Sequence, residues 1–286
     1  MGQGQVGQAV ATATSAVSPE ARQVRQLVEG YYDIQKLRLS VYNRIVAFVR
    51  GDINRLARAL EAKLKRGVDV ERLRPSDVAD MIIDGRLEVP REVEHLVWLH
   101  NELHRMEREL AKLLDSWSVA HPIRAHFLDR VRGIGGVLAS AIIAYLSPIS
   151  RFPNISKLWA YCGLKPGARK VRGQKTGYNV RLKKLCFLIA TSFEKQPAEK
   201  SYYRRIYERK KNYYLNRPDI VEKLEKGVPG VRAHVRMMAL RYTVKRFLAD
   251  LWLEWRKLEG LPITMPYPFA VQGHSTTEYE PWQPDR

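Results

Sequence analysis

Apolar residues recur every three or four positions over long stretches of this 286-residue sequence, and the longest regular stretch runs from Val93 to Val119. This spacing places one apolar stripe along a helix of about three and a half heptads and predicts a coiled-coil-like seam. The seam can close as an antiparallel helical hairpin within one chain or as a contact between two copies. We expect a homo-oligomer through the helix of residues 93–119. The stripe consists of Leu96, Leu99, Leu103, Met106, Leu110, Leu113 and Trp117.

Shorter helical patterns account for most of the remaining sequence, and no alternating strand pattern rises above them. Pro75, Ser76 and Asp77 predict the N-cap of one of these helices. The sequence therefore predicts an all-α fold, in which a long coiled-coil-like helix is followed by a helix-hairpin-helix domain and a C-terminal amphipathic helix. The other predicted helices cover residues 19–50, 53–65, 78–83, 123–130, 156–162, 180–193 and 231–258.

Changes in composition divide the chain into five parts. The first residues carry no charged group and no apolar period, which predicts a disordered leader. The last residues are rich in proline and aromatic side chains, and we expect this tail to lie over a surface of the protein. The predicted parts are a leader (1–18), an N-terminal helical region (19–92), the heptad helix (93–120), the helix-hairpin-helix domain (121–260) and the tail (261–286).

The positive charge is concentrated in the second half of the sequence. The chain has 49 Lys and Arg against 30 Asp and Glu, a net charge of +19. Residues 1–120 hold 18 basic and 17 acidic groups, whereas residues 121–286 hold 31 and 13. Such a field favours binding to a polyanion. Because no stretch has the ~20 apolar residues that span a bilayer, the charge favours nucleic acid over an acidic membrane.

Cysteine usage and targeting signals point to the cytoplasm. Cys162 and Cys186 are the only cysteines, and neither belongs to a Cys-x-x-Cys pair. We expect two buried free thiols, which suits a reducing compartment. The first residues lack the charged and apolar regions of a signal peptide. The sequence thus predicts a cytoplasmic, nucleoid-associated protein.

A glycine hairpin at residues 131–135 is the most informative local motif. Its sequence is Val-Arg-Gly-Ile-Gly, and it joins two helical patterns. Glycine permits the positive φ of a tight turn, and backbone N–H groups at the following helix N-terminus can bind phosphate. The motif resembles the helix-hairpin-helix of DNA repair proteins, although an ordinary turn between two helices fits the same residues. The predicted binding residues here are Arg132, Gly133, Gly135 and Gly136.

A basic loop follows the hairpin in the sequence. Residues 165–211 hold 15 basic and 3 acidic groups. Residues 165–175 have glycine and basic residues without any period, which predicts an exposed loop. We expect these groups to contact the phosphate backbone. The predicted binding residues are Lys165, Arg169, Lys170, Arg172, Lys175, Arg181, Lys183, Lys184, Arg204 and Arg205.

Two further clusters allow two interpretations each. Five tyrosines lie between Tyr202 and Tyr214 among basic residues, and they either stack on unpaired bases or pack, like Tyr203 and Tyr207, into the core. His100 and His104 lie one helical turn apart and either bind a metal or face solvent. We expect no metal and no cofactor.

Several short sequence motifs occur in the same order as in a known family, which the chain resembles. The chain resembles the C-terminal transposase domain of the IS-one-ten class, which includes the Piv-type DNA invertases, over residues 93–258. The resemblance rests on the motifs His121-Pro122, Val131-Arg132-Gly133-Ile134-Gly135, Ile149-Ser150-Arg151-Phe152 and Leu158-Trp159-Ala160-Tyr161-Cys162-Gly163-Leu164-Lys165-Pro166, and on Asn179 and Tyr203. The resemblance implies DNA as a partner, and RNA is also possible because members of the class work with a guide RNA.

The chain lacks the residues for both catalytic elements of this family, the acidic metal ligands and the serine nucleophile. The family carries an N-terminal RNase-H-like domain with four acidic metal ligands, but Asp33, Asp52, Asp77 and Asp84 lie in no strand pattern. The family's serine nucleophile follows the Gly-Leu-Lys-Pro word, and residues 167–173 contain no serine. The sequence therefore predicts no catalytic residue and a DNA-binding protein without strong sequence specificity. The alternatives are a recombinase subunit that obtains its metal domain in trans, with Thr176 or Tyr178 as nucleophile, and a DNA-coating or packaging protein.

Overall fold

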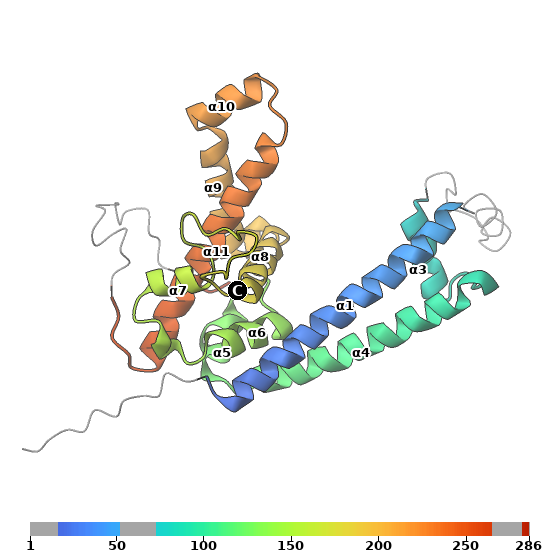
Figure 1. The fold of residues 1–286 in the computed structure, drawn as a ribbon, viewed down its shortest axis with the longest axis horizontal. Helices are drawn as coiled ribbons and strands as arrows, with labels where there is room; N and C mark the ends of the chain where they lie inside the picture. Colours follow the sequence, from blue (N-terminus) through green and yellow to red (C-terminus); the bar gives the residue numbers. More distant parts are fainter. Residues whose placement is uncertain (1–16, 52–72, 265–281, 286) are drawn as a thin grey trace, which may run out of the picture. The chain divides into compact units, whose positions relative to one another are not determined.

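The described part of the chain is mainly helical in a computed structural model, which describes residues 17–51, 73–264 and 282–285 (Figure 1). No strand occurs within these ranges, so the predicted all-α class is confirmed. The predicted leader up to residue 16, the predicted helix 53–65 and most of the tail lie outside them. The α-helices are α1 (Pro19–Gly51), α3 (Pro75–Ile83), α4 (Glu94–Val119), α5 (Pro122–His126), α6 (Gly136–Leu146), α7 (Ile155–Tyr161), α8 (Val180–Glu194), α9 (Tyr202–Leu215), α10 (Pro218–Glu225) and α11 (Val231–Leu258).

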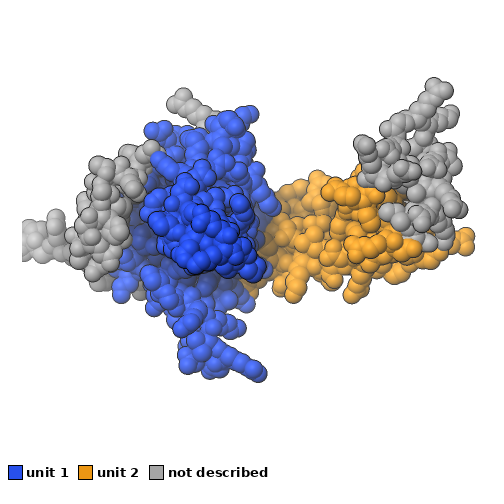
Figure 2. All heavy atoms as spheres, turned by 90° about the horizontal axis from the view of Figure 1, so that it is seen from above, with its two compact units in different colours: residues 1–25, 115–286 blue, residues 26–114 orange. Residues whose placement is uncertain are grey.

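The chain forms two compact units (Figure 2). Unit 1 contains residues 1–25 and 115–286, and unit 2 contains residues 26–114. Among the described helices, none is long and apolar enough to cross a membrane.

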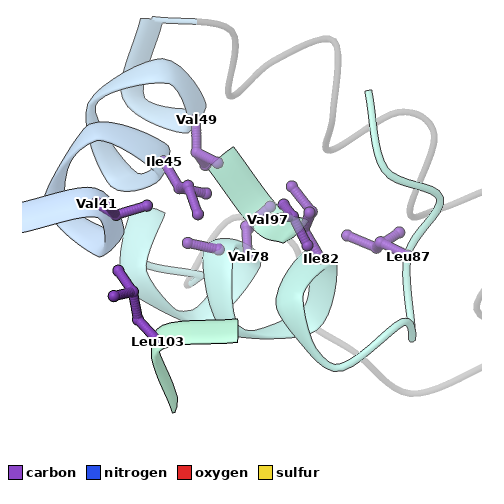
Figure 3. Close-up of a cluster of buried hydrophobic side chains, with 9 residues drawn as sticks. Val41, Ile45, Val49, Val78, Ile82, Leu87, Val97 and Leu103 are labelled. Carbon is purple, nitrogen blue, oxygen red and sulfur yellow. The ribbon is translucent and has the colours of Figure 1, made fainter. Parts of the chain in front are cut away.

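Unit 2 is built on an antiparallel pair formed by α1 and α4 (Figure 1). Its core gathers side chains from both helices and from α3, including Val41, Ile45, Ile82 and Val97 (Figure 3). Glu107 accepts hydrogen bonds from Tyr31, from Gln35 at 2.8 Å and from Arg38 at 2.6 Å. The helical hairpin within one chain, one of the two predicted arrangements, is therefore present.

The buried stripe of α4 differs from the predicted seam. Leu103 is buried as predicted, but the next buried position is Glu107, while Met106 is 49% and Leu113 57% exposed. The carboxylate of Glu107 is stabilised in the seam by its three partners on α1, a contact that apolar periodicity does not reveal. The prediction was wrong by one residue here, and it leaves apolar side chains on the outer face of α4.

In unit 1 the long helix α11 packs against α8 and α9. Phe247 of α11 contacts Phe193 of α8 and Tyr203 of α9, with ring centroids 5.3 and 5.4 Å away. Phe127 joins this cluster at 5.9 Å from Phe247. The predicted helix 123–130 breaks at Phe127 into α5 and a 3-10 helix, η3 (Leu128–Arg130), because the chain turns to place Phe127 and Leu128 in the core.

Local signals misplaced the start of one helix and missed another helix. The structure begins α3 at Pro75 with Arg74 as N-cap, and Asp77 lies at the third helical position, where it accepts the Arg74 N–H at 3.0 Å. The predicted N-cap of this helix was therefore placed too late. Helix α10 was not predicted, and it is a short element that begins at Pro218.

Candidate nucleic-acid interface

The glycine hairpin, residues 131–135, connects η3 to α6 and is anchored on the C-terminal part of α8. Gly133 has φ +97°, a conformation that L-residues rarely adopt. A Cβ at this position would meet Ser192 Oγ at 3.1 Å. Ser192 Oγ donates a hydrogen bond of 2.6 Å to the Gly133 carbonyl oxygen. Glycine at 133 is thus required by the turn and by close packing at once.

The N-terminus of α6 faces a carboxylate of the same unit. Gly135 is the N-cap and has open space around the position of a Cβ. At Gly136, a Cβ would lie 2.0 Å from Asp115 Oδ1. Asp115 pairs with Arg124 at 2.9 Å. The absent side chain of Gly136 therefore makes room for an acidic group at the helix end where phosphate binding was predicted.

A second carboxylate binds the hairpin itself. Asp285 Oδ2 accepts the backbone N–H of Arg132 at 2.9 Å, and its Oδ1 accepts the N–H of Tyr202 at 2.5 Å. The Asp285 N–H donates to the Arg130 carbonyl oxygen at 2.9 Å. Trp282 lies against Phe127 with ring centroids 4.5 Å apart. Residues 282–285 are therefore docked on the hairpin and on the first turn of α9.

The basic loop, residues 165–179, is held from inside by two cations. Lys183 Nζ donates to the Ala168 carbonyl oxygen at 3.0 Å and lies 4.6 Å from the ring centroid of Tyr178. Arg241 donates to the carbonyl oxygens of Leu164 and Lys165 at 2.8 and 2.7 Å. Lys183, predicted as a phosphate contact, thus already has partners in the loop.

The remaining cations of this region lie outward. No Asp or Glu occurs between residues 165 and 193. We call the outward set the loop surface, and its side chains are exposed at the loop and at the start of α8. It consists of Lys165, Arg169, Lys170, Arg172, Lys175, Arg181 and Lys184.

The hairpin and the loop surface meet α8 at separate places. Lys183 contacts the loop and Ser192 contacts the hairpin. With a rise of 1.5 Å per residue the two contacts are roughly 14 Å apart along the axis, and at 3.6 residues per turn they fall on opposite faces. The hairpin and the loop surface therefore pack against different parts of α8, where the sequence suggested one continuous site.

The two predicted arginines of α9 belong to the hairpin side. Arg204 pairs with Glu208 at 2.8 Å, and the exposed Arg205 donates to the Ala198 carbonyl oxygen at 3.3 Å. Arg205 also lines a pocket of about 490 Å³ together with Lys200 and Asp285. Of the two predicted arginines, Arg205 is therefore the one beside the docked carboxylate.

Most of the tyrosine cluster belongs to the core. Tyr203 is fully buried and donates to Asp250 at 3.0 Å, and Tyr207 donates to Glu194 at 2.7 Å. Burial raises the pKa of Tyr207 to about 12, and the bond to Glu194 adds to this shift. Packing into the core, one of the two interpretations, is thus what the structure shows for Tyr203 and Tyr207, whereas Tyr213 is 58% exposed.

The other predicted clusters give no reactive site among the described residues. His100 is buried beside Arg38, with Nη1 and Nε2 3.5 Å apart, and the described residues contain no group of three metal-ligating side chains. Cys162 and Cys186 are buried free thiols, as expected, and burial raises the pKa of Cys162. Thr176 Oγ1 donates to the carbonyl oxygen of Tyr178 at 3.2 Å.

An apolar groove of about 560 Å³ lies between α8 and α11, beside the loop surface. Val180, Phe187 and Met237 contribute apolar walls, and Lys184 and Arg241 lie among the lining residues. The sequence showed each helix but not this groove, because the groove depends on how the two helices pair.

A comparison with protein families identifies the segment that contains both surfaces. Residues 125–204 match the transposase IS116/IS110/IS902 family. The predicted resemblance is confirmed over this segment, which is therefore transposase-related. The matched segment includes the hairpin, the basic loop, α8 and the beginning of α9. No protein of curated function matches the chain.

Two residues of the site escaped the sequence analysis. Asp115 and Asp285 both lie at the hairpin, but they are far from it in the sequence. The local signal for Asp115 is Gly136, a second glycine that a simple turn does not need, whereas Asp285 leaves no such signal. A glycine at the first helical position can indicate a side chain that approaches from elsewhere.

Proposed function

We propose that this protein binds the phosphate backbone of DNA without strong sequence specificity and without cutting it. The observation that supports this function is the loop surface, a set of exposed Lys and Arg side chains from a segment whose sequence contains no Asp or Glu. The match to a transposase family agrees with DNA as the partner. Contacts to phosphate fix position on the duplex and carry no sequence information.

The construction of the basic loop favours binding. Lys183 and Arg241 hold its backbone carbonyl groups, so the loop has fixed points on α8 and α11. The outward side chains therefore start from a defined backbone, which lowers the entropy lost on binding. Each neutralised phosphate releases counterions, and this release supplies most of the affinity of such a surface.

The same loop argues against strand cleavage. Residues 167–173 offer no hydroxyl group. Tyr178 packs closely against Gly163, where a Cβ would lie 2.7 Å from its ring, and Lys183 covers the ring. Lys183 Nζ also donates to the Tyr178 hydroxyl oxygen at 3.5 Å, whereas a nucleophilic tyrosine needs a neighbouring base that accepts its proton. We therefore assign binding and not catalysis to this surface, and its grip on DNA would keep the protein on the nucleoid in the cytoplasm.

The decisive experiment reverses the charge of the loop surface. We expect the wild-type protein to bind a duplex of about 30 base pairs with a slope of log K against log salt near −5, which corresponds to about six phosphates. The variant Lys170→Glu/Arg172→Glu/Lys175→Glu is expected to lose about a hundredfold in affinity at low salt, with a slope shallower by roughly 3.

A matched control distinguishes the loop surface from net charge. Lys36→Glu/Arg44→Glu/Arg50→Glu changes the charge equally at exposed positions of α1. This control is expected to bind within about threefold of wild type, since separated surface charges are screened. Equal losses in both variants would contradict the proposal. Competition with structured RNA tests the choice of DNA, and preferential RNA binding would replace DNA as the partner.

The outer face of α4 is the place where two copies would associate. Trp98 is 64% exposed, and the exposed Met106 and Leu113 follow it at steps of eight and seven residues, on the same side of the helix. We propose a homo-oligomer through this face. Light scattering should give a multiple of 33.1 kDa for the wild type and the monomer mass for Trp98→Lys/Met106→Lys. The control Leu37→Lys/Leu39→Lys on α1 should keep the wild-type mass, and a monomeric wild type would refute the oligomer.

A further inference from the structure

The docked carboxylate of Asp285 suggests what the hairpin binds. Its two oxygens accept two backbone N–H groups, from Arg132 and Tyr202, that are 70 residues apart in the sequence. Two donors that converge on two oxygens of one anionic group also fit the non-bridging oxygens of a phosphate. The carboxylate belongs to the protein itself, whereas a phosphodiester would belong to a bound nucleic acid.

The surroundings of this carboxylate have the charge that a phosphate requires. Lys200 and Arg205 line the adjacent pocket, with Glu199 as the opposing acid. Arg132 is exposed at the edge of the hairpin. In the first turn of α9, the N–H of Arg204 donates to the Ser201 side chain. The N–H of Tyr202 donates to Asp285.

The contacts that hold residues 282–285 are few and separable. Trp282 stacks on Phe127, and the Asp285 N–H bonds to Arg130. The indole N–H of Trp282 is buried without a hydrogen-bond partner in the described part of the chain. A buried unpaired donor lowers the net gain of docking. Among the described residues, the segment therefore makes one ring contact and three hydrogen bonds, two of which reach the Asp285 carboxylate.

We propose that the N–H groups of Arg132 and Tyr202 form a binding site for one phosphodiester of a nucleic acid, and that Asp285 occupies this site in the free protein. The proposal rests on the proposed function, because it names a second contact of the same polyanion. Nucleic acid and Asp285 compete for the same two donors. Release of Asp285 is then a condition for full engagement of the hairpin, whereas binding at the loop surface does not depend on it.

The first test removes the charge of the competitor. Asp285→Asn is expected to bind duplex DNA about fivefold more tightly, which corresponds to a site that is open about one-fifth of the time in the wild type. The salt slope should stay close to the wild-type value, because the engaged complex contacts the same phosphates in both proteins. Trp282→Ala should raise the affinity in the same direction without any change of charge.

The control carries the same change of charge away from the hairpin. Asp219 is exposed on α10 and pairs with Arg217. Asp219→Asn is expected to bind within about twofold of wild type, because a single screened charge adds little. If Asp285→Asn and Asp219→Asn bind alike, the proposal is wrong, and circular dichroism of both variants establishes that they are folded.

A second readout does not depend on nucleic acid. Inorganic phosphate added to isotope-labelled Asp285→Asn should shift the backbone amide signals of Arg132 and Tyr202, and the wild type should need about fivefold more phosphate for the same shifts. Shifts without any DNA binding would refute the proposed function and keep the anion site. Normal DNA binding with neither the shifts nor the gain in affinity would refute the anion site and keep the proposed function.

Discussion

The glycine hairpin and the basic loop look alike in the sequence, since both combine glycine with cations, but they differ in what their own chain places beside them. The loop surface has no carboxylate between residues 165 and 193. The hairpin has two, because Asp115 lies at Gly136 and Asp285 accepts the N–H of Arg132. The loop presents side-chain charges, whereas the hairpin presents backbone donors that an internal anion already engages. A favourable anion site in a folded protein can therefore be occupied by the protein itself.

The largest expected effect distinguishes the two regions by their glycines. Gly133 of the hairpin and Gly173 of the loop both have positive φ, at +97° and +76°. Only Gly133 is crowded, by Ser192, Phe193 and Gln196. We expect Gly133→Ala to reduce the free energy of unfolding by about 3 kcal/mol, from left-handed strain plus overpacking. Gly173→Ala should cost about 1 kcal/mol, from strain alone.

Chemical denaturation followed by tryptophan fluorescence measures this difference. Gly167 serves as a second control, because it also has positive φ and open surroundings. Equal destabilisation at 133 and 173 would mean that the hairpin is no more tightly packed than the loop. This result would contradict the difference in packing between the two regions.

The sequence predicted those features of the fold that depend on local pattern. Helix α11 has the predicted bounds, and α8 differs by one residue at its end, because their apolar spacing and capping residues are local. The hairpin and the basic loop were also found from local composition. The burial of Glu107 in the α4 seam was not predicted, because its carboxylate is stabilised by Arg38 and Gln35 on α1.

The sequence could not show which cations are engaged by their own chain. Lys170 and Lys183 look equivalent in a basic run, but their environments depend on tertiary contacts. Lys183 donates to Ala168 and covers Tyr178, whereas Lys170 is exposed. The same holds for Asp285, whose partners are distant in sequence. Electrostatic pairing between remote segments leaves no periodic trace, unlike apolar burial.

The smallest expected effects separate these two lysines. Methionine keeps most of the side-chain volume and removes the charge in both variants. Lys170→Met should weaken duplex binding about threefold and make the salt slope shallower by about 0.9, because one phosphate contact is lost. Its loop should exchange amide hydrogens at the wild-type rate, since Lys183 and Arg241 hold the loop carbonyl groups.

Lys183→Met should give the opposite pattern. The salt slope is expected to change by less than half of the change expected for Lys170→Met. The reason is that the Lys183 ammonium donates to the Ala168 carbonyl oxygen and does not face the phosphate. Amide exchange in residues 165–179 should become faster, since a hydrogen bond to a charged donor contributes about 1.5–3 kcal/mol. If instead Lys183→Met lowers the slope as Lys170→Met does, Lys183 contacts phosphate directly, and the loop surface extends to the inner side of the loop.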